Sequence, residues 1–191
     1  VKNDLQRSAD KEDVGLSAHP VTKIISGAQT GVDMAGLDAG KEIGIPTGGT
    51  AAAKFQQSVG EKQKEFKPEL ANIYGLKEGK VTKRFTQDGR QYDDVYYQRT
   101  LDNAQEADGT IWFGNAGSPG GKLTLGKDAQ KGKPVPLVNP TSAQEIRNWL
   151  NKHNIKTLNV AGNREYTNPG IYDKAKTLLS LIHISEPTRP Y

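Results

Sequence analysis

Three glycine-bearing turns hold most of the polar side chains that could bind an anionic ligand. The first turn, residues 26–33, follows a short β-branched run and opens a helical pattern. Glycine allows a positive φ and close approach of the backbone to a ligand, and free amides at a helix start attract anions. Gln29 and Thr30 would add side-chain donors, whereas Asp33 could simply complement the helix dipole. The candidate residues of this turn are Gly27, Gln29, Thr30, Gly31 and Asp33.

The second turn lies between a predicted strand and a predicted helix, at residues 114–124. It offers flexible backbone amides at Gly120 and Gly121, the hydroxyl of Thr124 and the charge of Lys122. Amides, a hydroxyl and a cation at a helix N-terminus suit a phosphate group. A plain turn is the alternative interpretation.

The third turn, residues 159–165, also follows a predicted strand and is continued by residues 168–172. Arg164 could bind an oxyanion through two parallel N–H donors, and Glu165 could accept from a hydroxyl or a ring N–H. The alternative is an ordinary Arg–Glu pair on the surface. The glycine spacing of the first turn matches neither the dinucleotide-binding G-x-G-x-x-G pattern nor the P-loop.

The composition excludes several kinds of chemistry. The chain has no cysteine, so it has no disulfide framework, zinc–thiolate site, iron–sulfur cluster or cysteine nucleophile. His19 lies in a polar leader, His153 at the end of a predicted helix and His183 in the C-terminal tail. We therefore predict no catalytic residue and no metal ligand.

The net charge of +4 comes from one segment. Residues 51–91 contain nine Lys or Arg and five Asp or Glu, and the rest of the chain is balanced. The segment shows no clean hydrophobic period and is expected to be a basic, mostly loop-like insertion. Such a charge run is typical of a solvated face, with contact to polyphosphate or nucleic acid as the alternative.

The elements that must position the three turns alternate between strands and helices. We predict strands at 21–26, 45–47, 110–113, 134–138 and 156–160, and helices at 32–43, about 92–107, about 120–131, 142–153 and from 172. Trp112 is expected to fill the sheet core, and Tyr92, Tyr96 and Tyr97 to lie in the core or on a helix surface. The alternation favours a Rossmann-like three-layer α/β/α fold with a mostly parallel sheet, which binds ligands beyond the carboxyl ends of its strands.

The 191 residues suit one domain, which we place at 19–178. Residues 1–18 are polar and aperiodic and are expected to be a disordered leader. Residues 179–191 resemble a translated adapter of transposon-based sequencing libraries, and we interpret them as an artefact. No apolar run approaches the roughly 18 residues of a membrane span, so we expect a cytoplasmic protein.

Taken in order, the motifs resemble the molybdenum cofactor carrier-like family, a Rossmann-like group related to the lonely-guy-type phosphoribohydrolases. The resemblance covers residues 21–178. The matching segments are Ser-Gly-Ala-Gln-Thr-Gly-Val-Asp (26–33), Ile-Gly-Ile-Pro-Thr-Gly-Gly (43–49), Arg99-Thr100 with Asn103, Ala-Asp-Gly-Thr (107–110), Ser-Pro-Gly-Gly-Lys-Leu-Thr (118–124), Leu-Asn-Val-Ala-Gly-Asn-Arg-Glu (158–165) and Pro-Gly-Ile-Tyr (169–172).

The resemblance implies a non-catalytic protein that binds the molybdenum cofactor, a phosphorylated pterin, as cargo for a molybdoenzyme. The second turn would hold the phosphate, and Arg164 and Glu165 would close the pocket. A homo-oligomer is compatible with the family, and nucleic acid is not an expected partner. The implied ligand-binding residues are Gly27, Gln29, Thr30, Gly31, Asp33, Gly48, Gly49, Arg99, Ser118, Gly120, Gly121, Lys122, Thr124, Asn163, Arg164 and Glu165.

Two other functions share this fold. The phosphoribohydrolases resemble Pro-Gly-Gly-x-Gly-Thr-x-x-Glu, in which the glutamate is the catalytic acid/base. Here Leu123 replaces a glycine and Lys127 stands at the glutamate position, and a lysine cannot supply a carboxylate. The other alternative is a nucleotide-binding sensor module, which would signal by binding alone.

Overall fold

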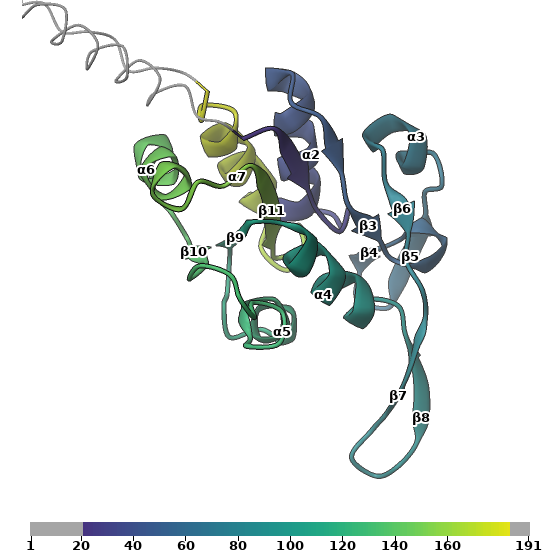
Figure 1. Cartoon of the computed structure of the whole chain (residues 1–191). Coiled ribbons are helices and arrows are strands. Elements are labelled where there is room, and N and C mark those ends of the chain that lie inside the picture. Colours follow the sequence, from purple (N-terminus) through teal and green to yellow (C-terminus); the bar gives the residue numbers. More distant parts are fainter. Residues whose placement is uncertain (1–20, 184–191) are drawn as a thin grey trace, which may run out of the picture.

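A computed structural model describes residues 21–183 and contains a central sheet of five parallel strands (Figure 1). Their order across the sheet is β10-β9-β11-β1-β2, and every neighbouring pair is parallel. The strands are β1 (Lys23–Ile25), β2 (Thr47–Gly48), β9 (Gly109–Phe113), β10 (Leu137–Val138) and β11 (Thr157–Gly162). The predicted Rossmann-like fold with a mostly parallel sheet is confirmed.

The last strand along the chain, β11, lies in the middle of the sheet between β1 and β9. If the strands are counted from β11, the order becomes 3-2-1-4-5, which is the order of a Rossmann sheet. The chain is therefore a circular permutation of that topology. The strand order reverses between β11 and β9, and such a switch point is where open α/β sheets bind ligands.

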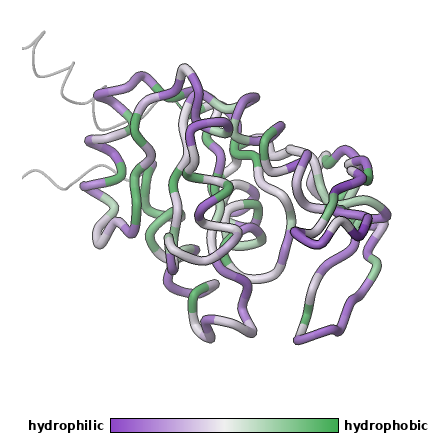
Figure 2. The backbone as a smooth tube through the Cα atoms, turned by 90° about the horizontal axis from the view of Figure 1, so that it is seen from below, coloured by the Kyte–Doolittle hydropathy of each residue, from purple (hydrophilic) through white to green (hydrophobic). Residues whose placement is uncertain are grey.

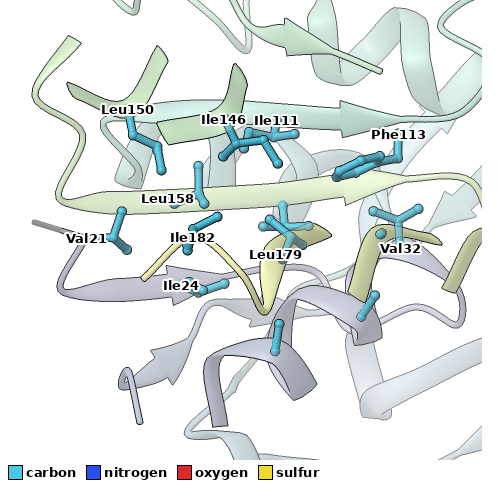
Figure 3. Close-up of a cluster of buried hydrophobic side chains, with 14 of the residues drawn as sticks. Val21, Ile24, Val32, Ile111, Phe113, Ile146, Leu150, Leu158, Leu179 and Ile182 are labelled. Carbon is cyan, nitrogen blue, oxygen red and sulfur yellow. The ribbon is translucent and has the colours of Figure 1, made fainter. Parts of the chain in front are cut away.

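Three helices cover one face of the sheet and enclose the main core (Figure 3). They are α2 (Val32–Ile43), α6 (Ala143–His153) and α7 (Ile171–Leu179). Ile24, Ile111 and Leu158 from the strands are fully buried against them. Burial of this apolar surface supplies the main driving force that holds the layers together.

The opposite face of the sheet carries α4 (Tyr97–Glu106) and α5 (Pro119–Leu125), and it is more polar. Buried Asn159 donates to Thr110 Oγ1 at 3.2 Å, and Gln130 donates to the same oxygen at 3.2 Å. Because buried polar groups need partners, these bonds let polar side chains occupy the interior behind the site.

Residues 50–94 form a small annex beside the sheet, so the expectation of a mostly loop-like insertion was wrong. Short-range pairing dominates it, which explains why no long hydrophobic period was visible. Hairpin β7–β8 projects from the body of the molecule (Figure 1), and its trace is mostly hydrophilic (Figure 2). The annex contains β3 (Thr50–Ala51), the 3₁₀ helix η1 (Ala53–Phe55), β4 (Gln56–Gly60), β5 (Gln63–Phe66), α3 (Leu70–Tyr74), β6 (Lys77–Glu78), β7 (Thr82–Phe85) and β8 (Gln91–Asp94).

Most predicted elements of the sheet domain form, with shifts at their ends. Helix α2 has the predicted bounds and ends at Gly44, whose φ of 79° is left-handed. Residues 92–94 belong to strand β8 rather than to the predicted helix, and α5 ends at residue 125 instead of 131. Strand β10 is reduced to residues 137–138, because prolines at 134 and 136 have no N–H to donate to a ladder.

The described chain extends past the predicted domain end at residue 178. Leu179 and Ile182 are fully buried in the core cluster. Residues 1–20 and 184–191 lie outside the described residues, so the interpretation of 1–18 as a leader stays a prediction. The adapter interpretation of residues 179–191 also stays a prediction, and of these only 179–183 are described. None of the helices within 21–183 has the length and apolar character needed to cross a membrane.

Candidate functional site

A cavity of about 690 Å³ opens beyond the carboxyl ends of β9 and β11, at the switch point of the sheet. The turns after those strands, helices α4 and α5 and the hairpin β7–β8 surround it. Its volume falls within the roughly 300–1,000 Å³ range of small-molecule sites. The lining residues are Gln29, Asp33, Arg84, Tyr92, Asp94, Tyr96, Tyr97, Arg99, Thr100, Trp112, Asn115, Ser118, Pro119, Gly120, Leu123, Thr124, Ala161, Gly162, Asn163, Arg164 and Thr167.

Half of the residues predicted for the site line this cavity, and they come from all three turns and from α4. These are Gln29, Asp33, Arg99, Ser118, Gly120, Thr124, Asn163 and Arg164. The other half do not line it, and one of them, Lys122, is solvent-exposed on α5. These residues are Gly27, Thr30, Gly31, Gly48, Gly49, Gly121, Lys122 and Glu165. Parallel strands place their turns at one edge of the sheet, which explains why the three turns meet.

The first turn is tied to strand β4 and is not an open anion cradle. The side chain of Gln29 donates to Gln56 O at 2.8 Å and accepts from Ser58 N at 2.9 Å. Thr30 Oγ1 lies 3.5 Å from Ser58 O. The polar groups predicted to bind an anion therefore hold the annex against the sheet domain.

The first and third turns are packed in direct contact. Val32 N donates to Asn163 O at 3.2 Å. Gly31 has a φ of +80°, and a Cβ there would lie 2.7 Å from Glu165 N. The close approach that glycine permits thus serves turn-to-turn packing at this position.

Asn163 also connects the second turn to the third. Its Oδ1 accepts from Asn115 N at 2.8 Å and from Asn168 Nδ2 at 3.2 Å. Gly114, with a φ of +123°, leaves room for this side chain, because a Cβ there would lie 2.5 Å from Asn163 Cγ. Asn163 therefore fixes the relative position of two cavity walls.

Glu165 caps helix α7. Its carboxylate accepts from Gly170 N at 2.7 Å and from Tyr172 N at 3.0 Å, which satisfies amides at the start of the helix. These bonds engage the carboxylate with backbone rather than with Arg164. Glu165 thus positions the chain that follows the third turn, and its role in ligand binding stays a prediction.

In the second turn, Ser118 is the N-cap of α5. Its Oγ accepts from Gly121 N at 3.1 Å and donates to Asn115 O at 2.8 Å. A Cβ on Gly121 would lie 2.6 Å from Ala116 O, whereas a Cβ on Gly120 would meet only Trp112 at 4.0 Å. Gly121 is therefore required by packing, and Gly120 is the glycine that faces the cavity.

Gly48 and Gly49 lie behind the first turn. With a φ of +115°, Gly49 packs so tightly that a Cβ would lie 2.8 Å from Ser26 N. Asn103 holds the adjoining strand β3 to α4, since it accepts from Thr50 N at 2.8 Å and donates to Thr50 O at 2.9 Å. Gly49 thus packs against backbone and Gly48 against the side chain of Lys23, and neither glycine lines the cavity.

Arg99 and Asp33 form the electrostatic centre of the cavity. Their side chains are only 11% and 6% exposed, and Arg99 Nη1 lies 3.9 Å from Asp33 Oδ2. Burial raises the pKa of Asp33 above its ordinary value, against the opposing effects of Arg99, of an amide bond from Gln29 and of Arg164. Burial also lowers the pKa of Arg99, against the attraction of Asp33. A buried cation with one distant partner is available to an anionic ligand.

Two arginines lie close to the ring of Tyr96. Arg164 Cζ is 4.9 Å from the centre of its ring, and Arg99 Cζ is 5.5 Å from it. The Tyr96 hydroxyl accepts from Gln56 Nε2 at 3.0 Å, which fixes the ring. Cation–π attraction and this bond hold both guanidinium groups at one wall of the cavity.

Several lining residues are not among the predicted site residues, above all Arg84, Tyr96, Tyr97 and Trp112. Trp112 is 2% exposed, as expected for a sheet residue, but it also lines the cavity. The run Val-Tyr-Tyr-Gln-Arg at 95–99 mixes aromatic and cationic side chains at the start of α4 and was the available signal. Arg84 reaches the site through the hairpin fold of the annex, which the sequence pattern did not reveal.

Two buried donors in the cavity wall lack partners. Arg99 Nε and Trp112 Nε1 have no hydrogen-bond partner within residues 21–183. An unsatisfied buried donor costs about 1–3 kcal/mol, so each needs an explanation. The same part of the chain contains no group of three His, Asp or Glu side chains that could hold a metal ion.

Comparisons with known proteins agree with this geometry. The model of the circularly permutated YpsA SLOG family matches residues 24–183. The fold is similar to a 1.45 Å crystal structure of a protein from Syntrophus aciditrophicus SB named "Putative molybdenum carrier protein". The two share 29% identity with a TM-score of 0.67, over 86% of this chain and 96% of that one. No curated protein sequence matches the chain significantly.

Proposed function

Because this chain belongs to the circularly permutated YpsA SLOG family, we propose that its cavity binds a phosphorylated ligand with a flat ring system. The molybdenum cofactor, a phosphorylated pterin, is the ligand that we favour. Binding without covalent change would make the protein a carrier, which delivers its cargo to a recipient molybdoenzyme. The name of the structurally similar Syntrophus protein supports this choice.

The observation that carries the proposal is the pair of arginines around Tyr96. Arg99 and Arg164 both lie within 6 Å of one ring, and Asp33 is the carboxylate that they share. One carboxylate faces two guanidinium groups, so it can neutralise only part of their charge. Arginine binds phosphate with paired N–H donors, and low local dielectric strengthens such contacts.

The aromatic residues of the wall suit the ring of the ligand. Tyr96, Tyr97 and Trp112 all line the cavity. Their π-faces can contact a flat heterocycle, and Trp112 Nε1 could donate to a ring carbonyl or nitrogen. Gly120 supports close approach, because no side chain covers the cavity at that position.

A nucleotide-binding sensor is the second candidate, and the strand order favours it. The permuted 3-2-1-4-5 sheet places the cavity where Rossmann folds bind nucleotides. A nucleotide and a pterin phosphate share a phosphate and a planar nitrogen heterocycle. The two candidates therefore differ in ring identity and not in the kind of site.

Tryptophan fluorescence separates these candidates. The chain has two tryptophans, so Trp149→Phe leaves Trp112 as the single reporter in the cavity wall. We expect metal-free pterin phosphate and the molybdenum cofactor, titrated anaerobically, to quench it at lower concentrations than AMP or GMP. Arg99→Gln and Arg164→Gln should each weaken pterin binding about tenfold, which corresponds to ~1.4 kcal/mol. Tighter binding of AMP or GMP than of the pterins would favour the sensor. Pterin affinities that neither arginine variant weakens would refute the site.

A further inference from the structure

Hairpin β7–β8 presents one face to the cavity and the other to solvent. Across the hairpin, Arg84 is paired in register with Tyr92, and Lys83 with Asp93. Successive residues of a strand point to opposite faces. Arg84 and Tyr92 accordingly line the cavity, whereas Lys83 and Asp93 form an ion pair that does not.

The Arg84 side chain is held in place before any ligand binds. Its Cζ lies 4.0 Å from the centre of the Tyr97 ring, and its Nη1 lies 3.4 Å from Asp94 Oδ2. The other oxygen, Asp94 Oδ1, accepts from the amides of Tyr96 and Tyr97 at 2.8 and 2.9 Å. One carboxylate thus anchors both the start of α4 and the guanidinium.

The ion pair leaves most of this guanidinium for other contacts. A guanidinium has five N–H donors, and the contact with Asp94 engages one nitrogen. The Arg84 side chain is 39% exposed, compared with 11% for Arg99. Arg84 therefore lies at the mouth of the cavity and Arg99 at its floor.

We propose that Arg84 forms a second anion subsite, so that the ligand carries two anionic groups. The inference rests on the proposed function, because Arg99 and Arg164 around Tyr96 are taken as the first subsite. The ring of Tyr97 contacts the Arg84 guanidinium, as the ring of Tyr96 contacts those of Arg99 and Arg164. A ligand that spans both subsites lies along the aromatic residues of α4, with one negative group at the floor and the other at the mouth.

Two sources could supply the second anionic group. It is either a second phosphate, as in a nucleoside diphosphate or a dinucleotide form of the ligand, or the oxo-metal group of the cargo. Both present negative oxygens to a guanidinium fork. Paired probes that differ by one anionic group distinguish these sources.

The experiment uses the full chain with Trp149→Phe and measures dissociation constants from Trp112 fluorescence. One probe pair is AMP and ADP, and the other is metal-free pterin phosphate and the molybdenum cofactor. Arg84→Gln is the test variant. Lys83→Gln is the matched control, because it makes the same charge change on the same strand but on the outer face. Thermal unfolding verifies that both variants fold.

We expect the two-anion member of at least one pair to bind about tenfold more tightly than its partner. Arg84→Gln should reduce that ratio to below threefold, and Lys83→Gln should preserve it. The pair that responds identifies the source of the second anion. Ratios that Arg84→Gln leaves unchanged in both pairs, or the absence of binding by all four probes, overturn the subsite.

The subsite and the carrier function can fail separately. If ADP binds more tightly than AMP, if this preference depends on Arg84 and if no pterin binds, the subsite is supported and the carrier function is refuted. Pterin binding that depends on Arg99 but shows no Arg84-dependent ratio would support the carrier and refute the subsite.

Discussion

The guanidinium of Arg99 occupies the space that a side chain at Gly27 would need. A Cβ on Gly27 would lie 2.6 Å from Arg99 Cζ, so the buried guanidinium fits only against a glycine. Arg99 comes from α4 and Gly27 from the turn after β1, so the contact joins the helix to the edge of the sheet. Gly27 therefore determines where the Arg99 guanidinium can lie, although Gly27 does not line the cavity.

We predict that Gly27→Ala displaces Arg99 and weakens binding of pterin phosphate about tenfold. The backbone at position 27 is not left-handed, and the obstructing atoms end a flexible side chain, so the protein should still fold. Calorimetric titration measures the affinity. The effect should vanish in an Arg99→Ala background, because both changes then act through the same group. Additive losses in the double variant would show that Gly27 acts on its own.

Asp33 should make stability depend on pH. Burial raises its pKa in the folded protein above the ordinary value of 3.8. At a pH below 3.8, Asp33 is protonated in both the folded and the unfolded protein. Between 3.8 and the folded-state pKa the folded protein holds the proton more tightly, so the stabilisation that this proton provides is lost as the pH rises through the folded-state pKa. Relative to Asp33→Asn, the wild-type free energy of unfolding should therefore decrease over that interval.

Urea unfolding at a series of pH values measures this difference for the two proteins. Gln29 N donates to Asp33 Oδ2 at 3.2 Å. The amide oxygen of an asparagine can accept the same bond, so the comparison isolates the effect of the charge. A wild-type protein that gained stability over Asp33→Asn with rising pH would show that the arginines outweigh burial.

Glu165 should matter for stability more than for binding. Glu165→Ala removes the cap of α7, and loss of a helix cap costs about 1 kcal/mol. Glu165→Gln keeps one acceptor and should lose less. Chemical denaturation gives the stabilities, and fluorescence titration gives the affinities. Binding abolished at unchanged stability would instead place the carboxylate on the ligand.

The adjacent glycines of the second turn should respond differently to alanine. Gly121→Ala drives a Cβ toward the Ala116 carbonyl, so we expect a loss of about 1–3 kcal/mol from overpacking. Gly120→Ala meets only the edge of Trp112 and should fold as the wild type does. Differential scanning calorimetry compares the two, and equal melting temperatures would contradict the packing described for this turn.

Sequence reasoning located the sheet and its turns because local patterns determine them. A β-branched run ending at Gly27 and a helical period ending at Gly44 are properties of neighbouring residues, and α2 formed with the predicted bounds. Parallel strands then place all turns at one edge, so the general location of the site followed from the fold class.

The same reasoning could not assign individual roles. Whether Gln29 faces a ligand or strand β4 depends on how the annex folds back, which involves contacts between residues 27 or more positions apart. The sequence predicts Glu165 as a pocket residue because its carboxylate could accept from a hydroxyl or a ring N–H. Its capping of α7 depends on the path of residues 166–170. The cavity role of Arg84 required the hairpin register.

The most direct test of the carrier proposal is an anaerobic titration of the Trp149→Phe protein with metal-free pterin phosphate, repeated with Arg99→Gln and Arg164→Gln. We predict saturable quenching of Trp112 by the pterin, at lower concentrations than AMP requires, and about tenfold weaker binding in each variant. No quenching by the pterin, or quenching that both variants leave unchanged, would contradict the proposal that these arginines hold a phosphorylated pterin.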